Sequence, residues 1–236
     1  MKSFKQHLTE GVNDPAIFKA IFLAGGPGSG KSFIAGKTGL PALGYRIVNS
    51  DDAFEAMLKK AGMSLKIPSP SAGGKKDFDP EKDKEYKSYM GVRDKAKEIT
   101  KKQQANYLEG RLGLIIDGTG HKFDKIAKQS NELRQLGYDT HMIFVNTSLD
   151  VALERNAKRS RSVPESIVIK SWKEVQSNIG KFNTHFKSEM IIVDNNVADE
   201  DIIKQVYKRI QGLLKKKVKN TRAKSWIEME LARKKR

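Results

Sequence analysis

One glycine-rich loop constrains the fold of this chain more than any other stretch. It follows the apolar run Ala20–Ala24, precedes a helical pattern that begins at Lys31, and has the sequence Gly25-Gly26-Pro27-Gly28-Ser29-Gly30-Lys31-Ser32. Glycines let the backbone turn until successive N–H groups point inward, and the first turn of the helix adds its positive end. Strand, loop and helix in this order, with the pattern G-x-x-x-x-G-K-[ST], predict a site for the phosphates of a nucleoside triphosphate.

Four further apolar runs share the character of Ala20–Ala24. Each is short and nearly continuous in apolar residues, which is typical of strands covered on both faces. They are Tyr45–Asn49, Leu112–Ile116, His141–Asn146 and Met190–Val193, and the helical patterns between and after them cover 52–61, 81–110, 122–136, 148–159, 165–179 and a last stretch from about 199. The alternation predicts an α/β P-loop NTPase fold with a five-stranded parallel sheet sandwiched by helices.

The charge of the chain indicates its partner. The net charge is +17, from 45 Lys and Arg against 28 Asp and Glu. Proteins this basic commonly bind a polyanion, so nucleic acid is the expected partner, with DNA favoured. The alternative is that the charge serves solubility and attracts a phosphate ligand. No run approaches the roughly 20 apolar residues that cross a bilayer, so no membrane contact is expected.

Three segments are expected along the chain. They are a polar extension over residues 1–18, one P-loop domain over 19–211 and a basic tail over 212–236. An insertion at about 63–83, rich in proline, glycine and lysine, predicts a surface loop that is either a passive linker or a cover for the site. The tail is either a helix that grips nucleic acid or a solubilising end. Its Trp226 either stacks on a base or packs against the protein.

The composition also excludes several kinds of site. Cysteine is absent, which excludes disulfides, thiol catalysis and cysteine-ligated zinc and is consistent with the cytoplasm. The four histidines have no metal-ligand spacing. The N-terminal residues lack an apolar segment of the kind found in secretory signals.

Charged residues follow the phosphate loop and the second strand. Lys31 is expected to reach the β- and γ-phosphates, and the Ser32 hydroxyl to bind Mg²⁺. Asp51 and Asp52 follow the second strand, at the edge where parallel sheets bind ligands. A carboxylate there would orient an attacking hydroxyl and accept its proton, a role we assign to Asp51. The alternative is that Asp51 or Asp52 only caps the following helix.

Two further positions complete the predicted site. Asp117 follows the third strand and is expected to hold Mg²⁺ through water or to bind the acceptor; the alternative is a helix cap. Arg155 and Arg159 are four residues apart, which places them on one face of a helix. Guanidinium groups so placed suit a lid that closes over the transferred phosphoryl group, and the alternative is a solvated basic face.

Together these pieces resemble the kinase domain of phage polynucleotide 5′-hydroxyl kinases, over about residues 20–195. The stretches that carry the resemblance are GGPGSGKS, NSDD and ERNAKRSRSVPESIV. In that family the lid carries two arginines, which correspond to Arg155 and Arg159. The general base is the first Asp of a D-D pair, here Asp51, and an Asp ends the third strand, here Asp117. The resemblance implies an adenylate-kinase-like fold with an arginine lid, Mg-ATP as donor and, for a phage-encoded protein, the host cytoplasm.

The chain departs from that pattern at two positions. The family often has an arginine that contacts the acceptor phosphate where this chain has Phe54. Ile115 stands where the D-x-D-G-T motif of the family's phosphatase domain has its first Asp, so no phosphatase activity is expected. The layout is also similar to zeta-toxin-like kinases, which phosphorylate an activated amino sugar, and to phage kinases that phosphorylate hydroxymethyluracil within DNA.

Three functions therefore stay open at the level of sequence. The leading one is ATP-dependent transfer of a phosphoryl group to a hydroxyl of nucleic acid, either a 5′-OH end or a hydroxymethyl group on a base. The second is a kinase for a small nucleotide or nucleotide sugar. The third is a nucleotide-dependent binding module or remodelling ATPase, in which Asp51 would be dispensable.

Overall fold

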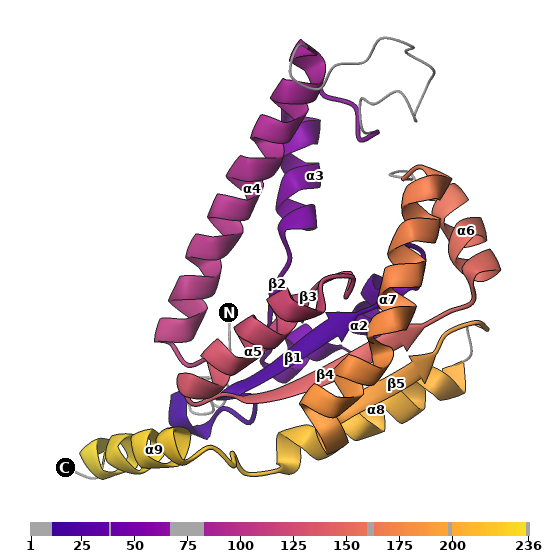
Figure 1. Ribbon diagram of the computed structural model, residues 1–236. Helices are drawn as coiled ribbons and strands as arrows, with labels where there is room; N and C mark the ends of the chain where they lie inside the picture. Colours follow the sequence, from indigo (N-terminus) through magenta and orange to yellow (C-terminus); the bar gives the residue numbers. More distant parts are fainter. Residues whose placement is uncertain (1–10, 38, 67–82, 160–162, 198–199, 235–236) are drawn as a thin grey trace.

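The chain folds around one parallel sheet. The computed structural model describes residues 11–37, 39–66, 83–159, 163–197 and 200–234. The sheet has five strands in the order β2-β3-β1-β4-β5 (Figure 1). They are β1 Lys19–Ala24, β2 Arg46–Val48, β3 Leu114–Asp117, β4 Asp139–Asn146 and β5 Met190–Asp194. Each strand coincides with one of the apolar runs, so the predicted α/β P-loop fold is confirmed.

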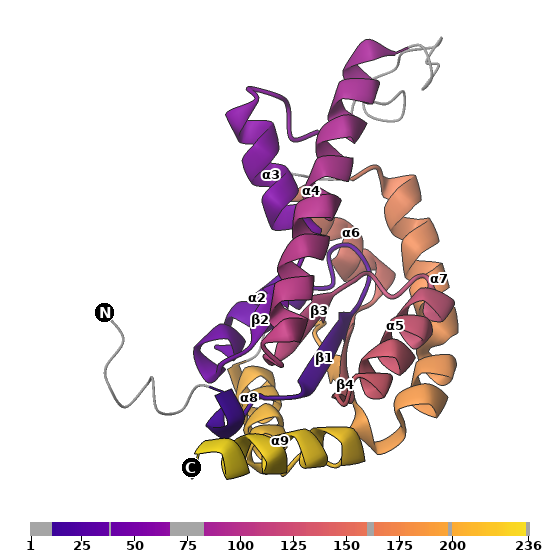
Figure 2. The same ribbon diagram turned by 90° about the vertical axis from the view of Figure 1, so that its left-hand side faces the viewer.

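Helices cover both faces of the sheet. They are α2 Lys31–Lys37, α3 Ser50–Lys60, α4 Lys84–Glu109, α5 Phe123–Gln135, α6 Leu149–Ala157, α7 Glu165–Phe186, α8 Glu200–Lys215 and α9 Thr221–Lys234, with short 3-10 turns at Gly11–Asn13, Leu40–Leu43 and Lys187–Glu189. Helices α2 and α8 pack on one face, where Ile34 and Ile210 meet Ile21 of β1. Helices α5 and α7 and the end of α4 pack on the other face (Figure 2).

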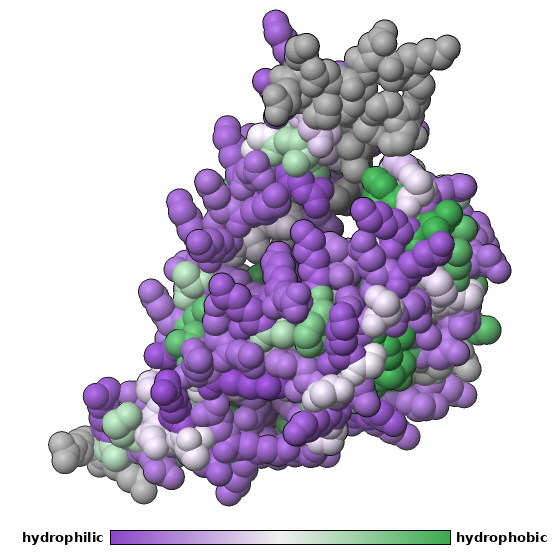
Figure 3. Space-filling view, viewed as in Figure 1, coloured by the Kyte–Doolittle hydropathy of each residue, from purple (hydrophilic) through white to green (hydrophobic). Residues whose placement is uncertain are grey.

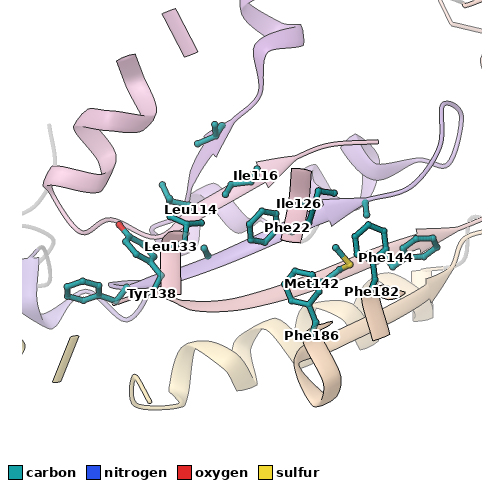
Figure 4. Close-up of a cluster of buried hydrophobic side chains, with 14 of the residues drawn as sticks. Phe22, Leu114, Ile116, Ile126, Leu133, Tyr138, Met142, Phe144, Phe182 and Phe186 are labelled. Atoms are coloured by element: carbon teal, nitrogen blue, oxygen red, sulfur yellow. The ribbon is translucent and has the colours of Figure 1, made fainter. Parts of the chain in front are cut away.

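The inner strands β1, β3 and β4 are buried on both faces, as their continuous apolar pattern predicts, whereas the edge strands β2 and β5 include exposed residues. All six residues of β1 are buried. Figure 4 shows Phe22 of β1 and Phe144 of β4 on the face that Phe182 and Phe186 of α7 cover. Each fully buried side chain of this size contributes about 1.5–3 kcal/mol, so this layer holds the carboxyl ends of the strands in a fixed arrangement.

A helical arm rises from the carboxyl edge of the sheet. It consists of α3 and the first half of α4, and it projects away from the sheet opposite α6 and the start of α7 (Figure 1). The arm has its own small core of Phe54, Leu58, Tyr89 and Ala96, in which the Phe54 and Tyr89 rings meet edge to face at 5.0 Å. Phe54 is therefore a packing residue of the arm.

The basic tail folds back onto the domain. Helix α9 lies along the amino edge of the sheet (Figure 1), and Trp226 meets Phe18 edge to face at a centroid distance of 5.4 Å. The backbone N–H groups of Lys219 and Asn220 donate to the Asp139 carboxylate at 2.7 and 3.1 Å. The boundaries expected after residues 18 and 211 are therefore not breaks in the packing, and Trp226 packs against the core.

Some expected element ends differ from the observed ones. Helix α6 ends at Ala157 with Lys158 as its C-cap, so Arg159 lies beyond the helix and not on a face shared with Arg155. Helix α7 continues to Phe186, beyond the expected end at 179. Most of the predicted insertion lies outside the described residues. Within the described parts of the chain, no helix has the length and apolar character needed to cross a membrane.

Candidate functional site

The phosphate loop has a shape that only glycine allows. Gly25, Gly28 and Gly30 have positive φ values of 151°, 78° and 88°. A Cβ on Gly28 would lie 2.1 Å from the Ala152 carbonyl oxygen, and one on Gly30 would lie 2.3 Å from the amide nitrogen of Asn195. The positive φ values and the close packing both require glycine at these positions. The loop therefore packs tightly against α6 and against the residue after β5.

Asn195 is a loop-supporting residue that the sequence analysis missed. It follows β5, is 3% exposed, and its amide donates to the Ser29 carbonyl at 2.8 Å. Its own carbonyl accepts from Arg155 Nη1 at 2.7 Å, while Arg155 Nη2 donates to the Asn196 carbonyl at 3.3 Å. Arg155 therefore ties α6 to the segment after β5, beside the loop, and its guanidinium is bound to these two carbonyls.

Lys31 lies against the loop. Its Nζ donates to the Gly25 carbonyl at 2.6 Å and to the Gly26 carbonyl at 3.4 Å. Burial lowers the pKa of Lys31, and the charge of Asp117 acts in the opposite direction. Ser32, the next residue, is exposed in the first turn of α2. The ammonium and the hydroxyl thus lie at the phosphate loop, and their contact with phosphates and a cation stays a prediction.

A single amide joins the two predicted carboxylate positions. Asn49 Oδ1 accepts from the backbone N–H of Asp51 at 2.8 Å, which makes Asn49 the N-cap of α3. Asn49 Nδ2 donates to Asp117 Oδ2 at 3.2 Å, at the end of β3. The alternative in which Asp51 or Asp52 caps this helix is therefore wrong. Asparagine just before a helical pattern is a recognised capping signal, but its second contact depends on the pairing of β2 with β3.

Charged side chains from several elements act on the pKa of Asp117. Burial raises its pKa, Lys31 and Arg159 act to lower it, and Asp51 and Asp52 act to raise it. Its Oδ1 is buried and has no hydrogen-bond partner among the described residues. The structure thus brings together charges from β3, α3, α2 and the segment after α6, all at the carboxyl edge of the sheet.

The loop after Asp117 is bonded directly to the phosphate loop. The Gly25 N–H donates to the Thr119 carbonyl at 3.2 Å, and the Gly118 N–H donates to the Leu23 carbonyl at 3.0 Å. Because strands β1 and β3 are neighbours in the sheet, these two loops are neighbours as well. The Asp117 position is therefore held in a constant relation to Lys31.

Asn156, near the end of α6, bonds to the residue just before Pro164. Asn156 is 3% exposed, and its side chain donates to the Val163 carbonyl at 2.7 Å and accepts from the Val163 N–H at 3.1 Å. The two bonds bracket Arg159, which is exposed and whose charge acts on both Lys31 and Asp117. The charge of Arg159 thus acts on the site, and the Arg155 guanidinium lies beside Gly30 of the phosphate loop. Residues 160–162 lie outside the described part of the chain.

Possible metal ligands at this edge are few. In the ranges that the structure describes, no group of three or more His, Cys, Asp and Glu side chains is arranged to hold a metal ion. A Mg²⁺ ion in a phosphate-binding site commonly takes only one or two protein oxygens, together with water and substrate phosphates. Ser32 and Asp117, the two predicted ligands, carry oxygens of this type.

Comparison with known proteins places the chain in a family. A family model described as an AAA domain matches residues 21–181. The chain belongs to this family. The AAA domain match begins in β1 and ends in α7, so it includes the phosphate loop, both carboxylate positions and the lid segment. Helices α8 and α9 lie outside it.

Solved structures resemble this AAA domain protein at low sequence identity. A putative kinase from Chloroflexus aurantiacus has a TM-score of 0.55 and 16% identity, over 82% of this chain and 97% of that chain. A chain of the Pnkp1/Rnl/Hen1 RNA repair complex has a TM-score of 0.49 and 19% identity, over 70% of this chain and 46% of that chain. Shikimate kinase from Bacteroides thetaiotaomicron has a TM-score of 0.45 and 13% identity, over 84% of this chain and 99% of that chain.

The family match and the similarity to the Chloroflexus structure establish a P-loop kinase fold and leave the acceptor open. At identities below one fifth, shared architecture does not determine which molecule a site binds. A comparison with curated proteins finds no match. The acceptor must therefore be argued from the residues of this chain.

Proposed function

We propose that the protein transfers the γ-phosphoryl group of ATP to a hydroxyl of nucleic acid, either a 5′-OH end or a hydroxymethyl group on a base. One observation carries the proposal. Asn49 links the start of α3, which bears Asp51, to Asp117 of β3, beside the phosphate loop that holds Lys31. A carboxylate next to a phosphate site is the arrangement that phosphoryl transfer to a hydroxyl requires.

The residues of the site fit ATP and Mg²⁺. The glycine loop leaves no room for Cβ atoms at Gly28 and Gly30, as expected where backbone approaches phosphate, and Asp117 Oδ1 is a buried acceptor with no protein partner among the described residues. Ser32 and Asp117 would hold the cation. When bound, Mg-ATP supplies the transferable phosphoryl group and a cation that neutralises phosphate charge.

Each residue of the site has a distinct role in the transfer. Asp51 is exposed in the first turn of α3, where it orients the acceptor hydroxyl and accepts its proton. The acceptor oxygen forms the new bond to the γ-phosphorus as the bond to the ADP oxygen breaks. Lys31 and Arg159 stabilise the negative charge on the phosphoryl group during transfer.

The choice of nucleic acid as acceptor is supported by charge and by the arm. The net charge of +17 favours a polyanion. Although Phe54 stands where polynucleotide kinases often have an arginine, the Arg93 guanidinium of α4 lies 5.5 Å from the centroid of the Phe54 ring. The arm therefore carries an arginine at nearly the same place, from a different helix, and we assign contact with the acceptor phosphate to Arg93.

A labelling experiment tests the proposal. The protein is incubated with γ-labelled ATP and 5′-OH DNA and RNA oligonucleotides, hydroxymethyluracil DNA, free nucleotides or nucleotide sugars, with Asp51→Asn as the matched variant. We expect label in nucleic acid and a loss of about 10²–10⁴-fold in the variant. Label only in small molecules would assign the site to a small-molecule kinase. Unchanged ATP turnover by Asp51→Asn, with no labelled acceptor, would indicate a binding module or ATPase.

A further inference from the structure

A groove leads away from the site along the surface of the sheet. It lies between α4 and α5, has a volume of about 850 Å³, and extends from Ser50 and Asp117 at the carboxyl edge to Leu136 beyond the end of α5. Figure 3 shows mainly hydrophilic side chains over this face of the molecule. Asp117, and Ser50 next to Asp51, therefore lie at one end of the groove.

The rims of the groove are basic. Five lysines line it, two from α4 and three from the start and middle of α5; they are Lys97, Lys101, Lys122, Lys125 and Lys128. The carboxylates in the lining are Asp117 and Glu132. Lys97 pairs with Asp94 at 2.8 Å. The other four lysines are exposed, and in the described part of the chain none of them forms an ion pair with a carboxylate. Their charge is thus available to a ligand.

The floor of the groove has the opposite character. It is formed by apolar side chains of the sheet and the two helices, namely Phe22, Val48, Leu108, Ile116, Ile126 and Leu133. An apolar floor between cationic rims matches a single strand of nucleic acid, whose phosphates contact lysines while its bases contact apolar surface. A duplex keeps its bases stacked inside and cannot use such a floor.

We propose that this groove binds the first nucleotides of a single-stranded acceptor, with the 5′-hydroxyl at Asp51 and the strand directed toward Leu136. The inference rests on the proposed function and narrows it to a strand end, in DNA or RNA. The groove volume of about 850 Å³ lies near the upper end of the range of roughly 300–1,000 Å³ for small-molecule sites, so it admits more than one nucleotide.

The far end of the groove meets the basic tail. Arg222 Nη1 donates to the Gln135 carbonyl at 2.5 Å, and Asn220 Nδ2 donates to the Arg134 carbonyl at 2.7 Å, at the end of α5. The start of α9 therefore lies where a strand that follows the groove would leave it. The tail lies far from the reacting hydroxyl, so its charge acts only on the longer acceptors.

Two double variants of equal charge test the groove. Lys101→Gln/Lys125→Gln removes one lysine from each rim, and Lys208→Gln/Arg209→Gln removes two exposed cations from α8 on the opposite face of the sheet. The acceptors are a nucleoside 3′-phosphate, 5′-OH single strands of DNA and RNA of increasing length, and a blunt duplex. Melting temperatures of both variants establish that they fold.

The groove variant should lose kcat/KM for single strands by about tenfold, with the salt dependence of binding reduced by about two phosphate contacts. Its kcat/KM for the nucleoside 3′-phosphate and its KM for ATP should stay unchanged, and the α8 variant should match the wild type throughout. Wild-type protein should favour the single strand over the blunt duplex.

Three results would overturn the inference. Equal losses in both variants would indicate attraction by net charge alone. Unchanged kcat/KM in the groove variant, with single strands still phosphorylated, would reject the groove and leave the proposed function standing. A wild-type protein that phosphorylates no polynucleotide would reject both together.

Discussion

One lysine begins β1 and another follows the phosphate loop after it, and the two lysines have different surroundings. Lys19, at the amino end, is 3% exposed and donates to the Pro15 and Lys216 carbonyls, both at 2.8 Å. Lys31, past the carboxyl end, donates to carbonyls of its own loop and feels the charges of Asp117, Asp51 and Arg159. Burial lowers the pKa of both.

The difference predicts a structural role for Lys19 and a functional role for Lys31. Lys19 joins the start of the domain to the connection between α8 and α9, so its bonds hold two distant parts of the chain together. Lys31 makes only short-range bonds to Gly25 and Gly26, in a loop whose shape depends on glycine. We therefore expect substitutions at the amino edge to affect stability and those at the carboxyl edge to affect catalysis.

The largest expected effect is that of Lys31→Met. Loss of one preorganised cation from the site should lower kcat by about 10²–10³-fold, because such groups act on charge that develops in the transition state. The melting temperature should change by only a few degrees. Single-turnover phosphoryl transfer and calorimetry measure the two quantities. A Lys31→Met protein that keeps its activity would contradict the functional role expected for Lys31.

The next largest effect is that of Trp226→Ala at the amino edge. Since Trp226 is half-buried against Phe18, its truncation should lower the free energy of unfolding by about 2 kcal/mol, below the cost for a fully buried tryptophan. Denaturant titration measures this loss, and kcat for a short acceptor should stay at the wild-type value. Truncation of the chain after Gly212 is a poorer test of the Trp226 contact, because it also removes the buried residues Val218 and Ala223.

Asn49 offers a test within a single residue. Asn49→Ser keeps an oxygen that caps α3 but loses the longer amide, whose Nδ2 reaches Asp117, whereas Asn49→Ala loses both groups. We expect Asn49→Ala to lower stability by about 1 kcal/mol and Asn49→Ser by much less. Both should lower kcat to a similar degree. If kcat instead followed stability, the contact with Asp117 would have no part in catalysis.

The last effect concerns how stability depends on pH through Lys19. Burial lowers its pKa to about 8, from 10.5. Between these pH values the unfolded chain keeps a proton that the folded chain has released, so rising pH favours folding. Between pH 8 and 10.5 the unfolding free energy of the wild type should therefore rise relative to that of Lys19→Met. Below pH 8 the difference between the two unfolding free energies should be constant. Urea titrations across this range measure it, and a flat difference would contradict the prediction.

The sequence was sufficient for the sheet and for the place of the site. Continuous apolar runs such as Ala20–Ala24 predict buried strands, and parallel strands end at a common edge. That is why Asp51 and Asp117, 66 positions apart, could be assigned to one site. The phosphate loop needed no tertiary information, because its glycines specify a local backbone conformation.

Other features depend on contacts between distant segments. Arg155 and Arg159 have helical spacing, yet α6 ends between them, and the Asn195 and Asn196 carbonyls accept from Arg155. Composition predicted a charged tail, whereas the apolar side of α9 packs Trp226 against Phe18.

What the sequence determined by itself is therefore local: strands, the phosphate loop and the order of the charged residues along the chain. The tertiary structure decided which charges meet, through Asn49 between β2 and β3 and Asn195 beside the loop. It also decided that the lysines of α4 and α5 face one groove. The physical reason is that backbone conformation follows from neighbouring residues, whereas the partner of a side chain follows from how helices and strands pack.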